Sequence, residues 1–356
     1  MKRNEVHFFP GANTPEGFFS YYRSALDSCN YVYIIKGGPG TGKSGYMKRV
    51  ARTAREKDLT VEYLHCSSDP FSLDGIIVDG GRFAMVDGTS PHIIEPRYPG
   101  ATETVINLSD FWDVTELKRR KNSIIETDIN IKYEFGRAYK YLAAAKDVIS
   151  INNEIYESNL CIDALNDMSD ALAEDILRKT DKDGKSVRSR CGFASGITPS
   201  GLMSYVASLA KGYERIYAVT GYGGYKMLHS ISHLMEKNGV YCEKYYCPMY
   251  PSERIEHLFI PSTGIAFLTH NRHHGVHLIS NDVIDLTEYS NITRVSLSAQ
   301  VLSENERMYD KLLEMSVSCL KDAYWLHNTL ESYYIPAMNF SALDNQCSAF
   351  IDNILN

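Results

Sequence analysis

The 356-residue sequence predicts an α/β protein built from two similar domains in tandem. Two observations lead to this prediction. A glycine-rich segment near residue 40 stands between a strand-like run and a helix-like run. A series of residues from the first half also recurs in the second half at a nearly constant spacing. Each domain is therefore expected to hold a mainly parallel sheet flanked by helices.

The glycine-rich segment, residues 37–44, matches the pattern G-x-x-x-x-G-K-[ST]. Residues 31–35 before it are apolar and β-rich, and residues 46–55 after it have a helical composition. Glycines let successive backbone N–H groups turn inward around a phosphate, and the N-terminus of the following helix adds positive potential. The segment therefore predicts a nucleotide-binding P-loop, and the domain around it is expected to be of the P-loop NTPase type.

Individual residues of this segment have expected roles. Lys43 is expected to bridge the β- and γ-phosphates, and the Ser44 hydroxyl is expected to hold Mg²⁺. The chain has no clear N-K-x-D motif for reading guanine, so ATP is the expected nucleotide. The predicted nucleotide-binding residues are Gly37, Gly38, Pro39, Gly40, Thr41, Gly42, Lys43, Ser44 and Gly45.

Two aspartates further along are candidates for chemistry at the phosphates, together with Lys43. Residues 83–86 are apolar and lead into Asp87, a pattern typical of a Walker B strand whose aspartate anchors the water shell of Mg²⁺. Ser44 and Asp87 are therefore the predicted metal residues. Asp69 is the candidate for positioning the attacking water, and capping of a local turn is its alternative role. Weaker candidates for positioning the water are Asp74 and His92.

The first half of the chain recurs in the second half. Matching residues lie 184 positions apart at first (198 − 14 = 184) and 181 apart beyond the P-loop (247 − 66 = 181). A sustained series with small gaps indicates an internal duplication. We expect an active domain with a helical extension at 1–180 and a degenerate repeat at 190–356, joined by a polar linker. The pairs include Phe9/Phe193, Thr14/Thr198, Gly17/Gly201, Tyr21/Tyr205, Glu62/Glu243 and Cys66/Cys247.

The second copy of the P-loop, residues 221–228, departs from the first where phosphate would bind. It is shorter by at least one residue, and Met227 follows Lys226 where a hydroxyl is expected. Tyr222 and Tyr225 would crowd a phosphate. The second domain is therefore predicted to be a degenerate copy with a structural or regulatory role.

Other segments allow less definite predictions. Helical patterns cover residues 114–177 and 299–335, and these helices are expected to cover the sheet of their own domain. Four histidines within 270–277 favour a polar loop over a metal site, because no ligand cluster accompanies them. The candidate arginine fingers, among which the sequence does not choose, are Arg82, Arg97 and Arg272.

Charge and composition exclude some classes of partner. The formal net charge of −7 argues against a general nucleic-acid or anionic-membrane binder. No apolar run approaches the ~18 residues that a transmembrane helix needs. The eight cysteines form no C-x-x-C pair, which is typical of a reducing compartment. We expect a cytoplasmic protein whose partner is a nucleotide, while a homo-oligomer or a protein partner stays open.

The whole chain resembles a family of uncharacterised bacterial tandem P-loop ATPase-like proteins, found mainly in Firmicutes. The segments that carry the resemblance are 7–11, 14–17, 37–44, 65–70, 86–89, 107–112 and 198–199. The resemblance implies ATP binding at a P-loop and no specific reaction. Members often carry a good P-loop in the second half too, and this chain departs from them there.

These observations predict a Mg²⁺–ATP-binding P-loop NTPase that hydrolyses ATP slowly at one competent site in the N-terminal half. Two other classes stay open. One is a phosphotransferase that uses the same site on a small-molecule hydroxyl. The other is a nucleotide-dependent switch or scaffold that does not hydrolyse ATP, which the uncertain identity of the catalytic acid favours.

Overall fold

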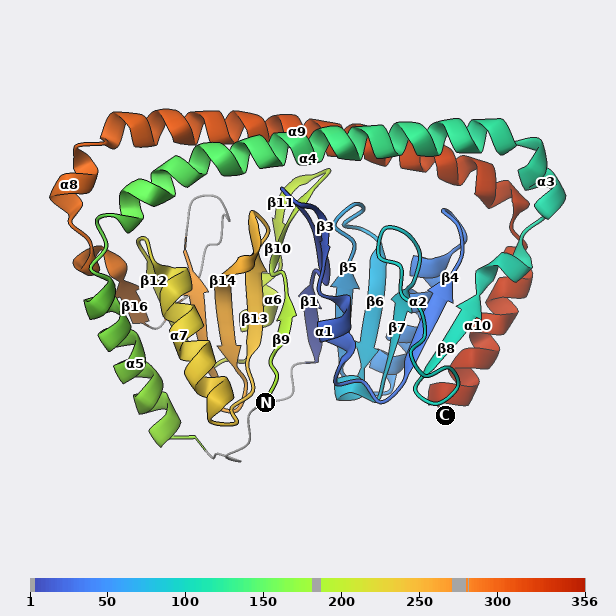
Figure 1. Cartoon of the computed structure of the whole chain (residues 1–356). Helices are drawn as coiled ribbons and strands as arrows, with labels where there is room; N and C mark the ends of the chain where they lie inside the picture. Colours follow the sequence, from blue (N-terminus) through green and yellow to red (C-terminus); the bar gives the residue numbers. More distant parts are fainter. Residues whose placement is uncertain (1–3, 181–186, 271–279, 281, 356) are drawn as a thin grey trace.

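The computed structural model describes residues 4–180, 187–270, 280 and 282–355. They form an α/β fold with two six-stranded, mostly parallel sheets that are flanked by helices (Figure 1). The predicted α/β class and the presence of two similar sheets are therefore confirmed. None of the helices in the described part of the chain is both long and apolar enough to span a membrane.

The first sheet has the strand order β1-β5-β6-β7-β4-β8, and only β6 runs against its neighbours. Its strands read as short apolar runs because helices and the second half cover both faces. Helix α2 (Lys43–Glu56) packs on it through Met47 and Val50. The strands are β1 (Glu5–Phe8), β4 (Val32–Lys36), β5 (Val61–His65), β6 (Leu73–Val78), β7 (Phe83–Asp87) and β8 (Glu103–Asn107).

The second sheet repeats this order position by position, as β9-β13-β14-β15-β12-β16. Helix α7 (Gly224–Lys237) takes the place of α2. A short hairpin and a short helix follow the first strand of each copy: β2 (Gly11–Thr14), β3 (Gly17–Ser20) and α1 (Tyr22–Leu26), then β10 (Ser195–Thr198), β11 (Gly201–Ser204) and α6 (Val206–Ala210). The other strands are β9 (Arg190–Gly192), β12 (Arg215–Thr220), β13 (Glu243–Cys247), β14 (Tyr250–Ile260), β15 (Ile265–Thr269) and β16 (Asp282–Asp285).

Two long helices run in opposite directions across both sheets (Figure 1). They are α4 (Lys121–Glu157) and α9 (Ala299–Tyr334), each preceded by a short helix, α3 (Val114–Arg119) or α8 (Ile292–Ser296). A helix of 37 residues such as α4 spans about 55 Å at 1.5 Å per residue. The C-terminal end of each long helix therefore lies over the sheet of the other half.

The helices that end each half are consequently exchanged. Helix α5 (Ile162–Arg178) packs against α7 and the second sheet, whereas α10 (Phe340–Leu355) packs against α2 and the first. The expectation that each domain's helices cover their own sheet was wrong, because α4 and α9 are too long to end where they began. The division into domains at 1–180 and 190–356 stays a prediction. Helix α5 from the first range covers the second sheet, and α10 from the second range covers the first sheet.

The crossings are matched pairwise. Two backbone hydrogen bonds join the chain at each end of the long helices. Each bond at one end has a counterpart at the other end, with donor and acceptor residues shifted by 178 positions (291 − 113 = 178; 337 − 159 = 178). This spacing extends the internal repeat through the helices. The four bonds are Asp113 N–H to Ala337 O (2.7 Å), Asn339 N–H to Phe111 O (2.7 Å), Cys161 N–H to Tyr289 O (2.7 Å) and Asn291 N–H to Asn159 O (2.8 Å).

The two sheets meet where β1 and β9 end, at the centre of Figure 1. Phe9 and Phe193, which are 184 positions apart, each donate a backbone N–H to the other's carbonyl oxygen at 2.9 Å. Both side chains are fully buried. This reciprocal pair lies on a pseudo-twofold axis that relates the two halves.

A buried arginine joins two matched glutamates beside this axis. Arg190 lies 2.5 Å from Glu62 and 3.1 Å from Glu243, and the two glutamates occupy equivalent positions on β5 and β13. The guanidinium also stacks over the Phe8 ring, 4.9 Å from its centroid. One cation therefore neutralises a carboxylate from each half.

We predict that Arg190→Met destabilises the protein by about 3–5 kcal/mol, because it leaves two carboxylates without their partner in a buried site. The free energy of unfolding from urea denaturation measures this. The control is Arg188→Met, which removes an exposed cation 3.5 Å from Asp27 and is expected to cost less than about 1 kcal/mol. Equal effects of the two substitutions would contradict the role given to Arg190.

A pair of neutral histidines also lies at this junction. His7 Nδ1 and His65 Nε2 are 2.8 Å apart, and the His65 ring stacks on Tyr205 with centroids 4.2 Å apart. Burial, together with the neighbouring His7, lowers the pKa of His65 to about 4. Burial also lowers the pKa of His7. Both rings are therefore held neutral in the folded protein.

Because the folded protein binds these protons more weakly than the unfolded chain, stability should fall as the pH drops below 6.5, down to about pH 4. Urea midpoints measured at several pH values across this window test the prediction. In His65→Gln the dependence should be shallower, since the variant lacks the group with the lower pKa. Identical pH profiles for the variant and the parent would rule out His65 as the source.

Candidate functional site

Residues 37–44 join β4 to α2, so the strand, loop and helix expected around this segment are all present. Gly40 (φ 65°) and Gly42 (φ 90°) adopt left-handed backbone conformations that other residues reach only with strain. Helix α2 begins at Lys43, directly after Gly42. The loop lies at the same sheet edge as Asp87, because β4 and β7 are parallel neighbours.

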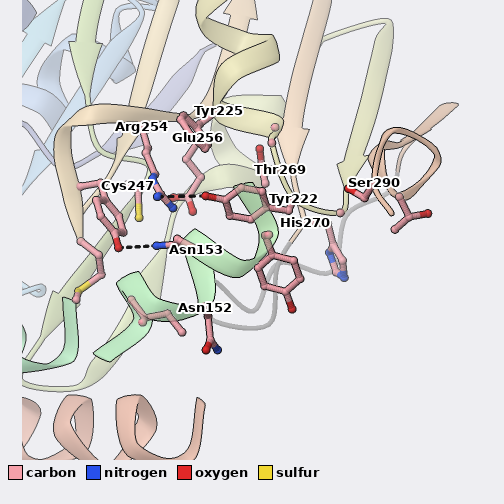
Figure 2. Close-up of a pocket in the computed structure, with 18 of the residues that line it drawn as sticks. Asn152, Asn153, Tyr222, Tyr225, Cys247, Arg254, Glu256, Thr269, His270 and Ser290 are labelled. Atoms are coloured by element: carbon pink, nitrogen blue, oxygen red, sulfur yellow. Dashed lines mark hydrogen bonds between the residues drawn. The ribbon is translucent and has the colours of Figure 1, made fainter. Parts of the chain in front are cut away.

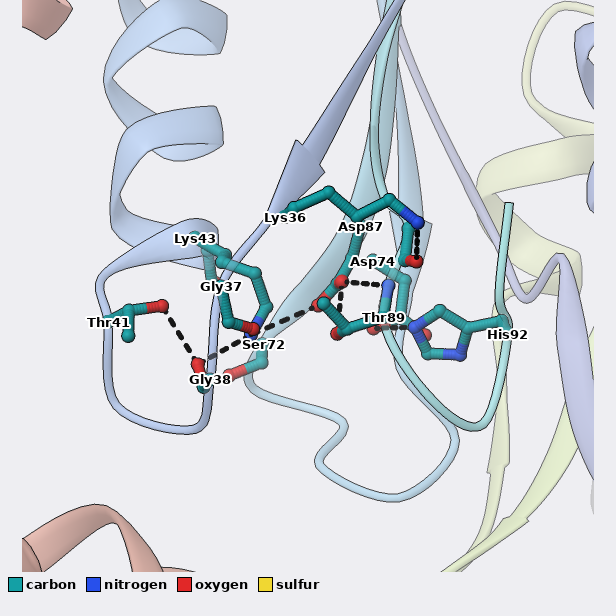
Figure 3. A network of polar contacts seen from close by, with 12 residues as sticks. Lys36, Gly37, Gly38, Thr41, Lys43, Ser72, Asp74, Asp87, Thr89 and His92 are labelled. Atoms are coloured by element: carbon teal, nitrogen blue, oxygen red, sulfur yellow. Dashed lines mark hydrogen bonds and ion pairs between the residues drawn. The ribbon is translucent and has the colours of Figure 1, made fainter. Parts of the chain in front are cut away.

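Lys43 folds back over the loop (Figure 3). Its ammonium group donates to the carbonyl oxygens of Gly37 at 2.9 Å and Gly38 at 2.8 Å. It also lies 3.6 Å from Asp87 Oδ2, and both side chains are largely buried. Thr41 Oγ1 donates to the Gly38 carbonyl at 2.8 Å and so closes the loop. The structure thus brings together two of the three predicted catalytic residues.

The other predicted polar residues make local contacts. Ser44 Oγ accepts the backbone N–H of Leu73 at 3.0 Å, which ties the start of α2 to the start of β6. Asp69 accepts the Ser72 hydroxyl at 2.5 Å and the Phe71 N–H at 3.2 Å. These contacts are those of turn capping, the alternative role of Asp69, and its part in positioning water stays a prediction.

The end of helix α9 covers the loop, a contact that no sequence motif predicted. The Gly40 N–H donates to Glu331 Oε1 at 3.1 Å. A Cβ added at Gly38 would lie 2.8 Å from the Tyr334 ring, so glycine is required for this close approach. A carboxylate oxygen from the second half therefore occupies a backbone N–H that the sequence assigned to phosphate.

His327 lies one helical turn before Glu331, with its Nδ1 3.9 Å from Glu331 Oε1. Burial lowers the pKa of His327, and Lys43 lowers it further, while Glu331 acts in the opposite direction. The neutral imidazole is therefore favoured beside the loop. Neither His327 nor Glu331 stands in a recognisable motif, and only the repeat spacing of 178 could have aligned them with the second site.

A second group of polar residues lies beside Asp87. Asp74, Asp87 and His92 are all buried, and each offers a ligand atom within 4.8 Å of the others. Tyr22 donates its hydroxyl to Asp74 Oδ2 at 2.6 Å. Burial raises the pKa of Asp74, and His92 counteracts this in part. Asp74 and His92 were predicted from the sequence as weaker candidates for positioning the attacking water. Their contact with Asp87 was not predicted.

Two of the three candidate arginine fingers, Arg82 and Arg97, are among the described residues. Arg82 precedes β7, at the opposite sheet edge from Asp87, and donates to the Ile354 carbonyl at 3.0 Å. The backbone N–H of Arg97 bonds Glu103, at the start of β8. Arg272 and most of the histidine-rich segment 270–277 lie outside the described residues.

The second glycine loop differs from the first by three residues. Helix α7 begins at Gly224 after a left-handed Gly223, as α2 begins after Gly42. The spacing falls from 184 at the first glycine (221 − 37) to 181 at the last (223 − 42). When the first residues of α7 and α2 are matched, Gly224 therefore occupies the position of Lys43. The predicted equivalence of Lys226 with the P-loop lysine was wrong, because the deletion places Lys226 further along the helix.

Aromatic side chains surround this second loop, beside a cavity of about 510 Å³ (Figure 2). Tyr222 and Tyr225 both donate to Glu157 Oε1 at 2.7 Å. Arg254 stacks over Tyr250, 3.9 Å from the ring centroid. Helix α4 supplies Asn153, whose amide donates to Tyr250 at 2.7 Å. The second loop is thus surrounded by tyrosine rings, Asn153 and the charged Glu157 and Arg254, and it lacks the Lys43–Asp87 pair.

No protein-family model, curated protein or solved structure matches this chain. The resemblance to tandem P-loop ATPase-like proteins stays a proposal.

On the expectation that the loop binds Mg²⁺–ATP, we predict that Glu331→Gln raises the affinity about tenfold, because the negative carboxylate would compete with phosphate for the Gly40 N–H. Calorimetric titration gives the Kd. The control is Glu314→Gln, on the same helix with 74% of its side chain exposed, which should leave the Kd unchanged. Weaker binding in Glu331→Gln would mean that this carboxylate supports the site.

Proposed function

We propose that the chain binds Mg²⁺–ATP at residues 37–44 and hydrolyses it slowly, with one competent site in its N-terminal half. The observation that carries this proposal is the placement of Lys43 and Asp87. Both lie at the same edge of parallel strands, 3.6 Å apart, beside a glycine loop with left-handed residues. In open α/β sheets, ligands bind at the carboxyl ends of the strands.

The residues of the loop fit an anionic ligand. The Gly40 N–H already holds a carboxylate oxygen, that of Glu331, which shows that this donor can be satisfied by an anion. Lys43 is a cation of the same loop, and its ammonium group donates to the carbonyl oxygens of Gly37 and Gly38. A phosphate oxygen would take the place of the Glu331 oxygen and compete for Lys43.

The residues then have the following roles. Lys43 would neutralise charge that develops on the γ-phosphate, and Asp69 would position the attacking water. Ser44 and Asp87 would hold Mg²⁺, which when bound supplies charge neutralisation at the phosphates. The Thr89 hydroxyl and N–H both donate to Asp87 Oδ1, at 2.5 and 2.8 Å, and fix the direction of its other oxygen.

The contact between Glu331 and the loop favours a switch as the second candidate function. Helix α9 begins over the second sheet and ends at the loop, so displacing Glu331 would change the packing of a helix shared by both halves (Figure 1). A phosphotransferase stays a third candidate. The resemblance to tandem P-loop ATPase-like proteins supports ATP as the nucleotide, and we also propose a cytoplasmic location.

We expect steady-state phosphate release from Mg²⁺–ATP that falls about 100-fold or more in Lys43→Ala, because the loop then lacks its cation. Lys48→Ala is the matched control. Its ammonium donates to the Phe71 carbonyl, on an exposed part of the same helix, and it should retain the parent rate.

Equal rates for Lys43→Ala and the parent would contradict the proposed site. Tight ATP binding without turnover would exclude the hydrolase and favour the switch, or the phosphotransferase if an added hydroxyl acceptor then starts turnover. If turnover is found, Asp69→Asn tests the residue proposed to position water.

A further inference from the structure

The polar group formed by Asp74, Asp87 and His92 has a geometry that the proposed ATP site does not explain. Strands β6 and β7 pair antiparallel with Gly75 opposite Val86, so Asp74 and Asp87 are direct cross-strand neighbours. Both are buried, with 5% and 8% of their surface exposed. Like charges directly opposite each other destabilise a sheet unless something compensates for them.

Each carboxylate uses one oxygen for a structural hydrogen bond, and its other oxygen lies near a basic side chain. Asp74 Oδ2 accepts the Tyr22 hydroxyl, and its Oδ1 lies 3.8 Å from His92 Nε2. Asp87 Oδ1 accepts both donors of Thr89, and its Oδ2 faces Lys43. Hydrogen bonds of this kind orient carboxylate ligands in metal sites.

His92 gives an independent indication of a ligand. The residue is 7% exposed, and neither ring nitrogen has a hydrogen-bond partner among the residues that the structure describes. The ring is held between Tyr22 and Phe18, with centroids 5.0 and 5.6 Å away, and points toward Asp74 (Figure 3). A buried polar group without a partner costs free energy, which a bound ion would remove.

We propose that Asp74, Asp87 and His92 bind one divalent transition-metal ion of the Mn²⁺, Fe²⁺ or Zn²⁺ class. An imidazole nitrogen with two carboxylate oxygens suits these ions better than Mg²⁺ or Ca²⁺, which prefer oxygen ligands alone. The ligand atoms lie within 4.8 Å of one another, and slight closure brings them to the roughly 4 Å span allowed by bonds of about 2.1 Å.

This site does not depend on the proposed ATPase, because Asp74 and His92 belong to it alone and no nucleotide is needed to complete it. Among the described residues, Lys43 is the cation that pairs with Asp87, 3.6 Å from Oδ2, and it would compete with the metal. The metal would share Asp87 with the Mg²⁺ of the nucleotide. Removing the Lys43 charge should therefore strengthen metal binding while it weakens nucleotide binding.

The second half provides an internal comparison. The strand registers place Glu256 at the position of Asp74 and Thr269 at that of Asp87 (256 − 74 = 182; 269 − 87 = 182). Val206 replaces Tyr22 (206 − 22 = 184). The carboxylate pair and its supporting hydroxyl are therefore features of the first half.

The test uses the full chain, stripped of metal by chelation and free of nucleotide. Titration with Mn²⁺, followed by the electron paramagnetic resonance signal of free Mn²⁺, should show one ion bound per chain. Zn²⁺ should displace it, and millimolar Mg²⁺ should not. Absence of stoichiometric binding of both Mn²⁺ and Zn²⁺ would overturn the proposal.

Two substitutions, His92→Gln and Asp74→Asn, should each weaken Mn²⁺ binding more than tenfold. The control His233→Gln, which changes an exposed histidine of α7, should bind Mn²⁺ like the parent. Lys43→Ala should keep or tighten Mn²⁺ binding even where it abolishes ATP binding, so the two proposals fail separately. Unchanged binding in His92→Gln would overturn the assignment.

A spectroscopic measurement on the parent protein covers the case in which the His92 variant does not fold. Electron spin-echo modulation of bound Mn²⁺ should contain the coupling of one imidazole nitrogen. Bound Mn²⁺ without a nitrogen coupling would show that the ion lies elsewhere and would overturn the proposed site.

Discussion

The reciprocal backbone pairing of Phe9 and Phe193 sets the relation between the two halves on which the rest of the structure depends. It brings together β1 and β9, the edge strands of the two sheets, where unpaired backbone groups would otherwise be open to other chains. Arg190 adds a charge shared by Glu62 and Glu243. With the sheets fixed in this way, a helix of about 55 Å can start on one and end on the other.

That exchange gives the second half, which has Gly224 where the first has Lys43, a structural part in covering the first loop. Helix α9 reaches the first loop from the second half and supplies Glu331 and Tyr334 to its cover. Helix α4 reaches the second loop in the same way, with Asn153 and Tyr156 at the equivalent positions (331 − 153 = 178; 334 − 156 = 178). Each site is therefore completed by the opposite half, and neither half can be removed without opening the other's site.

Local features of the chain could be predicted because they depend on neighbours in the sequence. The strand before Gly37, the helix from Lys43 and the repeat spacing are of this kind. The exchange of helices could not be predicted. An apolar stripe shows that one face of a helix is buried, but it does not show which sheet that face packs against. Glu331 meets Gly40 across 291 positions, and Asp74 meets Asp87 only through the antiparallel register of β6. Long-range contacts of this kind leave no motif.

The two copies together separate what the architecture requires from what a ligand requires. Both keep the sheet order, the left-handed glycine before the helix and the long covering helix. Only the first keeps Lys43 and Asp87, where the second has the neutral Gly224 and Thr269. Burying charged side chains costs free energy on folding, and a protein with well-packed neutral groups in their place is often more stable. The second half forms the same fold without this pair, which supports the proposal that the first half keeps the pair for a ligand.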